Sequence, residues 1–211
     1  MIKEGEDIDK LITSLAMKEP DFVEFRLDSV HDFEVLRAIT QRKTFPAIAT
    51  DRSDRDMKSR KKLLLTAVES GFEFVDVELT TPVGETMVSE IRSRGAEVIV
   101  SYHDSSGTPS SSQLRKILDA EIEAGGNICK IVPTAIYPRD NLTVLNFLEN
   151  KPSESRVISF AMGALGTPSR ILCPLFGSEF TFAALGRDSA TAEGQLSIDD
   201  LRSVWKILGI Q

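Results

Sequence analysis

The sequence predicts an α/β protein with a parallel sheet, and its size favours an eight-stranded (β/α)8 TIM barrel. Short apolar stretches typical of buried strands alternate regularly with amphipathic stretches typical of helices, and no two strands form a hairpin. The chain has 211 residues, of which 41% are hydrophobic, and this suits one compact β/α-barrel domain over residues 1–211. No linker, low-complexity stretch or internal repeat indicates a second domain.

Seven stretches have the length and composition of strands. They lie at 22–27, 45–50, 72–79, 97–103, 127–133, 156–162 and 180–185. In the first of them, apolar residues from Val23 to Leu27 alternate with Glu24 and Arg26, so the apolar and charged side chains are expected on opposite faces. An eighth strand should precede the first helix, where only residues 1–3 remain. We therefore expect the first strand of the barrel to be very short or missing.

Amphipathic helices are expected between the strands, because apolar residues recur there three and four positions apart. These helices lie at 5–18, 33–39, 61–70, 83–94, 110–122, 142–148 and 197–208, with partial helix at 168–175. Their ends carry the residues that suit helix termini. Gly71 and Gly95 follow two of the helices, and Ser110 with Gln113 forms a capping box at the start of another.

Composition and charge exclude several classes of function. The net charge of −7, from 25 Lys and Arg against 32 Asp and Glu, disfavours binding to nucleic acid or to an anionic membrane. The sequence shows neither a signal peptide nor a membrane-spanning run, so we expect a cytoplasmic protein. Cys129 and Cys173 have no metal-ligand spacing and are expected to be buried apolar filler, and no metal site is predicted.

The stretch from Asn127 to Pro133 places one lysine inside an otherwise apolar strand. Alternation puts Lys130 on the same face as Ile128 and Val132. Apolar surroundings favour the neutral amine, which is a nucleophile that condenses with a carbonyl to give a Schiff base. The alternative is a lysine on an edge strand that reaches water along its own stem, and this stretch alone leaves both interpretations open.

Other polar residues are expected near this lysine, because β/α barrels place their chemistry at the C-terminal ends of the strands. The chain has there Glu24, Arg26, Arg52, Asp76, Glu78, His103, Lys130 and Arg170. Simpler explanations remain for some of them. His103 could be a structural residue at a strand end, and Glu24 with Arg26 could be an interior ion pair. Asp76 and Glu78 are expected to hold barrel cations in place. The run Gly163–Gly166 resembles a phosphate loop only weakly.

Six motifs match the order and rough spacing of a known family. They are Glu24-Phe25-Arg26, Ser101–Asp104, Cys129–Ile131, Ser169-Arg170, Phe176–Ser178 with Thr181-Phe182, and Gly194-Gln195. From Asp21 onward the chain resembles the type I 3-dehydroquinate dehydratases. The resemblance implies a lyase of the shikimate pathway, in aromatic amino acid biosynthesis, that converts 3-dehydroquinate into 3-dehydroshikimate. It also implies that no metal or organic cofactor takes part and that the protein forms a homodimer.

The resemblance implies three catalytic residues. Lys130 condenses with the ketone of the substrate, and His103 serves as general acid and base. Asp56 stands where the family commonly has Glu beside the histidine, and its expected role is to orient His103.

The resemblance also implies a set of substrate-binding residues. They are Glu24, Arg26, Arg52, Arg170, Phe182, Thr191 and Gln195. Arg170 and Gln195 are expected to hold the substrate carboxylate, and Phe182 to form an apolar wall. Residues 186–195 are expected to be a lid over the site. Counting back from Gln195 selects Thr191 as the hydroxyl contact and counting forward selects Ser189; we favour Thr191.

Two alternatives to this function are kept. One is another Schiff-base barrel such as a class I aldolase, which would need a phosphate site in the last loops. The other is a catalytically silent barrel that acts as a binding protein, since a fold alone does not establish activity.

Overall fold

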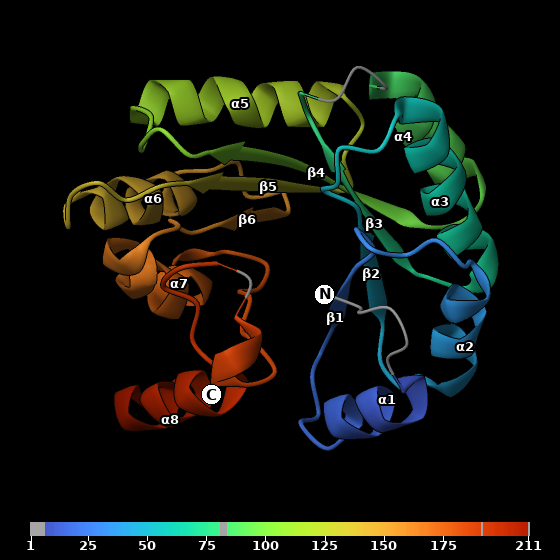
Figure 1. Ribbon diagram of the computed structural model, residues 1–211. Helices are drawn as coiled ribbons and strands as arrows, with labels where there is room; N and C mark the ends of the chain where they lie inside the picture. Colours follow the sequence, from blue (N-terminus) through green and yellow to red (C-terminus); the bar gives the residue numbers. More distant parts are fainter. Residues whose placement is uncertain (1–6, 81–83, 191, 211) are drawn as a thin grey trace. The chain divides into compact units, whose positions relative to one another are not determined.

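The structure, a computed structural model, describes residues 7–80, 84–190 and 192–210 (Figure 1). Its six strands lie in one sheet in the order of the sequence. They are β1 (Val23–Arg26), β2 (Ala47–Thr50), β3 (Phe74–Glu78), β4 (Glu97–Asp104), β5 (Ile128–Pro133) and β6 (Val157–Ser159). The pairs β1·β2, β2·β3 and β5·β6 are parallel, which confirms the predicted α/β class with a parallel sheet.

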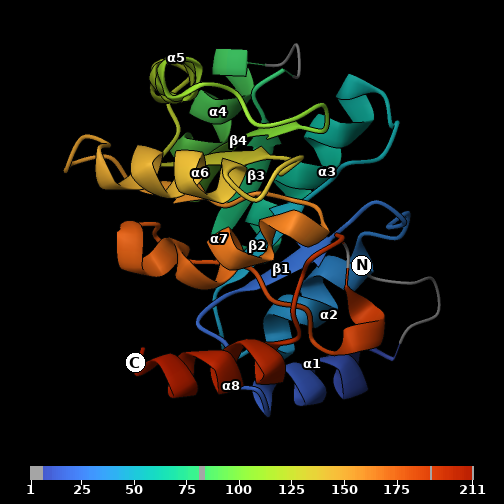
Figure 2. The same cartoon turned by 90° about the vertical axis from the view of Figure 1, so that its left-hand side faces the viewer.

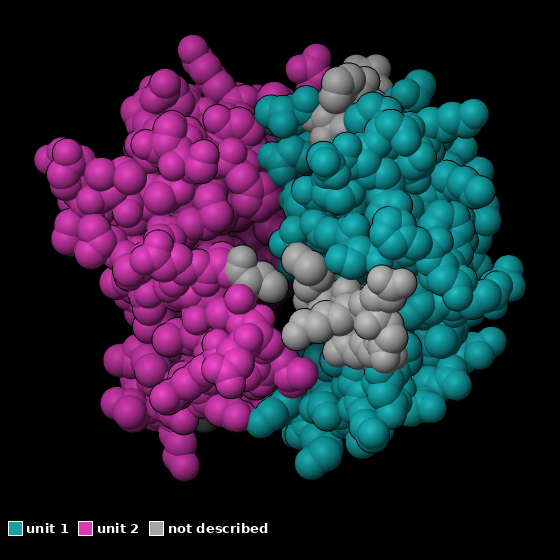
Figure 3. Space-filling view, in the orientation of Figure 1, with its two compact units in different colours: residues 1–100, 124–127 teal, residues 101–123, 128–211 magenta. Residues whose placement is uncertain are grey.

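The contacts between residues divide the chain into two compact units (Figure 3). The first unit holds residues 1–100 and 124–127, and the second holds residues 101–123 and 128–211. Strand β4 begins in the first unit and ends in the second. One domain over residues 1–211 stays a prediction.

The first unit packs helices on one side of its strands. These helices are α1 (Ile8–Ala16), α2 (Glu34–Arg42), α3 (Met57–Ser70) and α4 (Gly84–Ser93). In Figure 1, α2, α3 and α4 lie on the same side of β1–β3. Apolar side chains between Ile12 and Val100 form the buried core of this unit. The register aligns Arg26 with Thr50 and Thr50 with Asp76, so the three polar residues stand side by side near the C-terminal ends of their strands.

The second unit contains the helices α5 (Ser111–Glu123), α6 (Asp140–Glu149), α7 (Thr167–Leu172) and α8 (Ile198–Leu208). Each of these helices packs on the next, as Figure 2 shows. Three short 3-10 helices lie between them, at Ala164–Gly166, Cys173–Phe176 and Arg187–Ser189. The indole Nε1 of Trp205 donates a hydrogen bond to the carbonyl of Ile171 at 2.8 Å, which fastens α8 to the end of α7.

Helix caps explain where two helices begin. The carboxylate of Asp56 accepts the backbone N–H of Ser59 at 3.0 Å, so α3 starts at Met57, before the predicted position 61. The hydroxyl of Ser197 accepts the N–H of Asp200 at 3.1 Å at the start of α8, as the sequence suggests. None of the helices in the part of the chain that the structure describes is long and apolar enough to span a bilayer.

The predicted strand at 180–185 is wrong, because this segment makes only an isolated bridge between Ala184 and Ser197. Its polar groups bond to single neighbours and do not form a ladder. The hydroxyl of Thr181 donates to the carbonyl of Arg170 at 2.9 Å, and that of Ser178 donates to the carbonyl of Phe180 at 2.9 Å. The expected short first strand, at residues 1–3, lies outside the described residues.

Candidate active site

Lys130 lies in the middle of β5, a strand whose six residues are all buried. Only 5% of the lysine is exposed, and its Nζ stands 4.4 Å from the centre of the Phe182 ring. The face of an aromatic ring attracts cationic groups, so the Phe182 ring is a favourable neighbour for the lysine Nζ. The alternative of a solvated edge lysine is wrong, since β5 lies between β4 and β6 in the sheet and its lysine is buried.

Arg170 is the second buried cation of this unit. It lies on α7 with 4% exposure, and its guanidinium carbon is 4.4 Å from the centre of the Phe160 ring. Burial lowers the pKa of Arg170 to about 10. Among the described residues its Nε has no hydrogen-bond partner. A buried donor without a partner is costly, and an anionic group bound beside it would satisfy that donor.

Aromatic rings connect these two cations. The ring of Phe182 lies 6.0 Å from that of Phe160 and 5.5 Å from that of Phe180. Lys130, Phe182, Phe160 and Arg170 therefore form a continuous series of contacts. The role of Phe182 as an apolar wall of the site stays a prediction. Phe160 was missed by the sequence analysis. Its position just after β6, at the predicted C-terminal edge of the sheet, was the available signal.

His103 lies near the end of β4 and is half-buried. The chain just beyond it is tied to the end of β5 by Thr134, whose hydroxyl donates to the carbonyl of Asp104 at 2.8 Å and whose N–H donates to that of Gly107 at 3.1 Å. Thr108 donates in return to the carbonyl of Thr134 at 2.9 Å. These bonds fix the strand end that carries the histidine against the strand that carries Lys130.

In the first unit, the predicted site residues lie in hydrogen-bonded pairs. Glu24 accepts the hydroxyl of Thr50 at 2.8 Å. Arg26 makes two bonds to Asp28, at 3.0 and 2.8 Å, and Asp28 also accepts the backbone N–H of Arg52 at 3.3 Å. Burial raises the pKa of Asp28, but the guanidinium of Arg26 outweighs it and holds this pKa below its usual range. Asp28 was missed by the sequence analysis, although it follows Arg26 by two residues.

Arg52 is held by the two carboxylates that the sequence analysis left outside the site. Its Nη2 lies 2.5 Å from the carboxylate of Asp76 and 3.5 Å from that of Glu78. Burial lowers the pKa of Arg52, but these carboxylates outweigh it and raise the pKa above its ordinary value. The side chain of Asp76 is 0% exposed, so Arg52 compensates a fully buried charge.

Asp56 and the predicted lid residues Ser189 and Gln195 are less buried than Lys130 and Arg170. The exposed carboxylate of Asp56 caps α3, and hydrogen bonds from Ser59 hold its pKa below the usual range. The half-buried Gln195 closes a turn in which its N–H donates to the carbonyl of Ala192 at 3.2 Å. Thr191 lies outside the described residues. Ser189 is the alternative hydroxyl contact. Its hydroxyl accepts the N–H of Gly186 at 2.8 Å and donates to the carbonyl of Gly186 at 2.8 Å.

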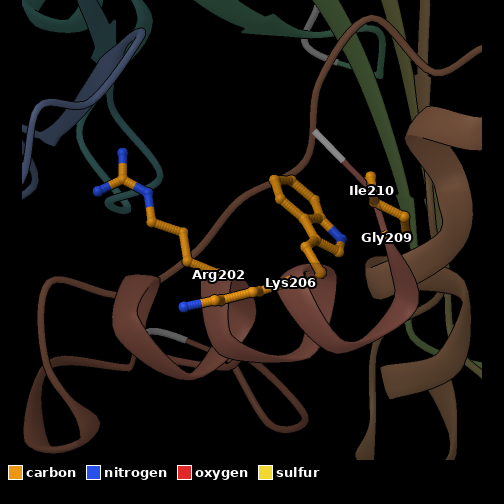
Figure 4. Close-up of a pocket in the computed structure, with 5 residues that line it drawn as sticks. Arg202, Lys206, Gly209 and Ile210 are labelled. Carbon is orange, nitrogen blue, oxygen red and sulfur yellow. The ribbon is translucent and has the colours of Figure 1, made fainter.

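A separate pocket lies along α8, and Figure 4 shows it. Its lining is Arg202, Trp205, Lys206, Gly209 and Ile210, and it includes no residue predicted for the site. Across residues 7–80, 84–190 and 192–210, no group of three or more His, Cys, Asp or Glu side chains is placed to hold a metal ion. The predicted site residues of each unit remain candidates for an active site.

Comparison with known proteins now identifies the family. A family model described as type I 3-dehydroquinase matches residues 1–211. The chain belongs to the type I 3-dehydroquinase family. Its curated relatives include the 3-dehydroquinate dehydratase of Dehalococcoides mccartyi, 31% identical over 88% of this chain and 85% of the relative. The 3-dehydroquinate dehydratase of Methanocaldococcus jannaschii is 31% identical over 90% of this chain and 89% of the relative.

Solved structures agree with this assignment. The crystal structure of 3-dehydroquinate dehydratase from Geobacillus kaustophilus is 27% identical, with a TM-score of 0.87 over 97% of this chain and 88% of that chain. An orotidine 5'-phosphate decarboxylase from Pyrococcus horikoshii, 12% identical with a TM-score of 0.61, shares the fold alone. The type I 3-dehydroquinase family consists of hydro-lyases with a TIM-barrel fold, so the predicted fold and enzyme class are confirmed.

Proposed function

We propose that this chain removes water from 3-dehydroquinate by way of an imine on Lys130. Membership of the type I 3-dehydroquinase family supports the substrate and the dehydration. The buried position of Lys130 against Phe182 is the observation that supports the covalent route. An amine held in an apolar wall, away from bulk water, is placed to condense with a ketone and to protect the imine from early hydrolysis.

The proposed reaction begins when the amine of Lys130 attacks the C3 ketone and water leaves, which gives an iminium. The iminium withdraws electrons and acidifies the neighbouring C2 proton. His103 takes that proton and returns one to the C1 hydroxyl, which departs as water. Hydrolysis of the imine then releases 3-dehydroshikimate and restores Lys130. An imidazole suits both proton transfers because its two protonation states are accessible near neutral pH.

The substrate carboxylate is assigned to Arg170 and Gln195. The buried guanidinium of Arg170, whose Nε has no hydrogen-bond partner among the described residues, supports the choice of this arginine. A planar guanidinium can make the bidentate contact that a carboxylate offers. The ring hydroxyls are assigned to Glu24, Arg26 and Arg52, whose carboxylate and hydroxyl partners already fix their side chains.

Two further properties remain proposals. We expect a homodimer, which sedimentation at several protein concentrations would reveal, and a cytoplasmic location. Dehydration needs no metal in this scheme, because the iminium is the electron sink, and exhaustive chelation should leave the rate unchanged. The family match favours dehydration over the aldolase alternative, and a phosphorylated sugar should not be a substrate.

Borohydride trapping tests the proposal directly. The reagent should reduce the imine in the presence of 3-dehydroquinate and leave a stable adduct, which mass spectrometry would find on the peptide that contains Lys130. Without substrate, no adduct should form. An adduct mapped to Lys116 or Lys151 would reject the assignment of the lysine. Absence of any adduct, together with absence of turnover, would favour the silent-barrel alternative.

A further inference from the structure

The run Gly163–Gly166, which weakly resembles a phosphate loop in sequence, forms a turn that contacts a distant glycine. The N–H of Gly166 donates to the carbonyl of Gly163 at 2.9 Å, so this donor is already engaged within the turn. Gly194, far along the chain, packs on the same carbonyl. A methyl group added at Gly194 would overlap the carbonyl oxygen of Gly163, and the φ of +79° at Gly194 is one that L side chains rarely adopt.

A threonine completes this contact. The hydroxyl of Thr167 lies 3.2 Å from the carbonyl of Gly194 and 3.1 Å from that of Ala164, and it can donate to either. A methyl group added at Gly194 would also come within 3.1 Å of this hydroxyl. Three residues, Gly163, Thr167 and Gly194, thus form a close backbone contact, which we call the glycine seat.

The glycine seat joins two elements that the proposed function needs together. Thr167 is the first residue of α7, and Arg170 lies three residues later on the same helix, so the two side chains lie on neighbouring positions of one helix face. Gln195 directly follows Gly194, in a turn closed by its own N–H on the carbonyl of Ala192. The backbone that presents Gln195 is therefore fastened at the start of the helix that presents Arg170.

We propose that the glycine seat positions Gln195 relative to Arg170, so that the two side chains bind the substrate carboxylate as one unit. This inference rests on the proposed function, since it assumes that the two residues share that carboxylate. Gly194 and Thr167 are positioning residues and need not touch the substrate. The requirement for glycine at position 194 comes from the Gly163 carbonyl, which leaves no space for a side chain.

Steady-state kinetics of Gly194→Ala is the first test. Displacing a binding group by about 1 Å can cost about 10²-fold, so kcat/KM for 3-dehydroquinate should fall by about that factor, mainly through a higher KM. Gly209→Ala is the matched control, because Gly209 has a φ of +70° with nothing within 4 Å of an added methyl group. It introduces similar backbone strain without the overlap. Equal kinetics in the two variants would overturn the inference.

Limited proteolysis is a second test that does not depend on turnover. Glu193 is exposed and directly precedes Gly194, so a protease specific for glutamate should cut there only when the seat opens. Thr167→Val removes the hydroxyl at nearly constant volume and should raise this cleavage rate about fivefold, the factor for one hydrogen bond. Thr167→Ser keeps the hydroxyl and should restore the rate of the unmodified protein. Cleavage at the exposed Glu154 should be the same in all variants.

The two tests separate failure of the inference from failure of the proposed function. If Thr167→Val and Thr167→Ser are cut after Glu193 at equal rates, the glycine seat does not hold the turn and the inference is overturned. If proteolysis follows the expected order but the unmodified protein neither turns over nor binds 3-dehydroquinate, the proposed function is rejected and the shared carboxylate site with it. Agreement of both tests supports the inference.

Discussion

The cations predicted for the site have different neighbours in the two units of this protein. In the first unit, Arg26 lies against Asp28, and Arg52 lies against Asp76 and Glu78. In the second unit, Lys130 and Arg170 lie buried against the rings of Phe182 and Phe160. A cation paired with carboxylates has its charge compensated in place. Arg170 differs from these paired arginines, because its Nε has no hydrogen-bond partner among the described residues and can still take an anionic one.

We propose that this difference reflects a division of work. The paired arginines of the first unit are fixed in position and suit the orientation of neutral hydroxyl groups. The ring-bound cations of the second unit suit the two reactive parts of the proposed substrate, namely a ketone for Lys130 and a carboxylate for Arg170. The predictions below test whether the division holds, from the largest expected effect to the smallest.

Removal of the amine at Lys130 should have the largest effect on activity. Lys130→Met keeps the length of the side chain but cannot form an imine, so turnover should fall by more than about 10⁴-fold, beyond what acid–base help alone contributes. Borohydride with 3-dehydroquinate should leave no adduct. Lys116→Met, at an exposed position on α5, is the control and should retain both turnover and adduct. Normal turnover in Lys130→Met would reject Lys130 as the residue that forms the imine.

Removal of the imidazole at His103 should give a smaller and qualitatively different loss. His103→Ala keeps the amine, so the substrate should still condense with Lys130 and then stall before proton transfer. The rate should fall by about 10²–10⁴-fold, the usual contribution of general acid–base catalysis. Mass spectrometry after borohydride should nevertheless find the adduct on Lys130. His31→Ala, at the other and exposed histidine, should behave like the unmodified protein. Loss of the adduct in His103→Ala would show that the two roles are not separable.

The compared arginines should differ in the sign of their effect on stability. Arg170→Met removes a buried cation whose Nε has no hydrogen-bond partner among the described residues, so the protein should become more stable by about 1–2 kcal/mol while its affinity for substrate falls. Arg52→Met should destabilise by about 3 kcal/mol, because it leaves the buried carboxylate of Asp76 without this partner.

Denaturant midpoints measure both effects. Arg187→Met is the control, since the Arg187 side chain is 82% exposed in a surface pair with Asp200 and its loss should leave the denaturation midpoint nearly unchanged. Stability changes of the same sign in Arg170→Met and Arg52→Met would break the comparison on which the division of work is based.

Sequence reasoning predicted the parts of this protein that depend on local pattern. Alternation located β1 and β5, and with them the buried face that runs from Val23 to Leu27 and the buried Lys130. Periodicity located the helices, and Gly71 ends α3 with a φ of +107°, as a glycine at a helix terminus should. The motif order also pointed to the family, which the full-length match then showed.

The remaining features depend on contacts between distant segments, which a local pattern does not contain. Phe180 to Leu185 has the composition of a strand, but its backbone bonds to scattered neighbours and no ladder forms. The Asp28 carboxylate pairs with Arg26, and the Phe160 ring lies beside Arg170. Neither partner could be recognised from its own sequence neighbourhood. Gly194 is explained by its φ of +79° and by the carbonyl of Gly163, some thirty residues earlier.

Asp56 should show the smallest effect, because it orients or caps and performs no step of the reaction. Asn caps helices about as well as Asp, so Asp56→Asn should leave the stability nearly unchanged, whereas Asp56→Ala has no acceptor for the Ser59 N–H and should lower it. The rate with Asp56→Asn should fall much less than with His103→Ala.

The pH dependence of stability distinguishes the cap from a catalytic role. Hydrogen bonds from Ser59 lower the pKa of Asp56 in the folded protein, so its contribution to stability is present above the pKa of the unfolded chain and is lost as the pH falls through the folded pKa. Asp56→Asn has no such proton to bind. Its denaturation midpoint should therefore approach that of the unmodified protein, or exceed it, as the pH falls below about 4. Losses of activity as large as those of His103→Ala, at a pH where stability is unchanged, would instead assign Asp56 a direct part in proton transfer.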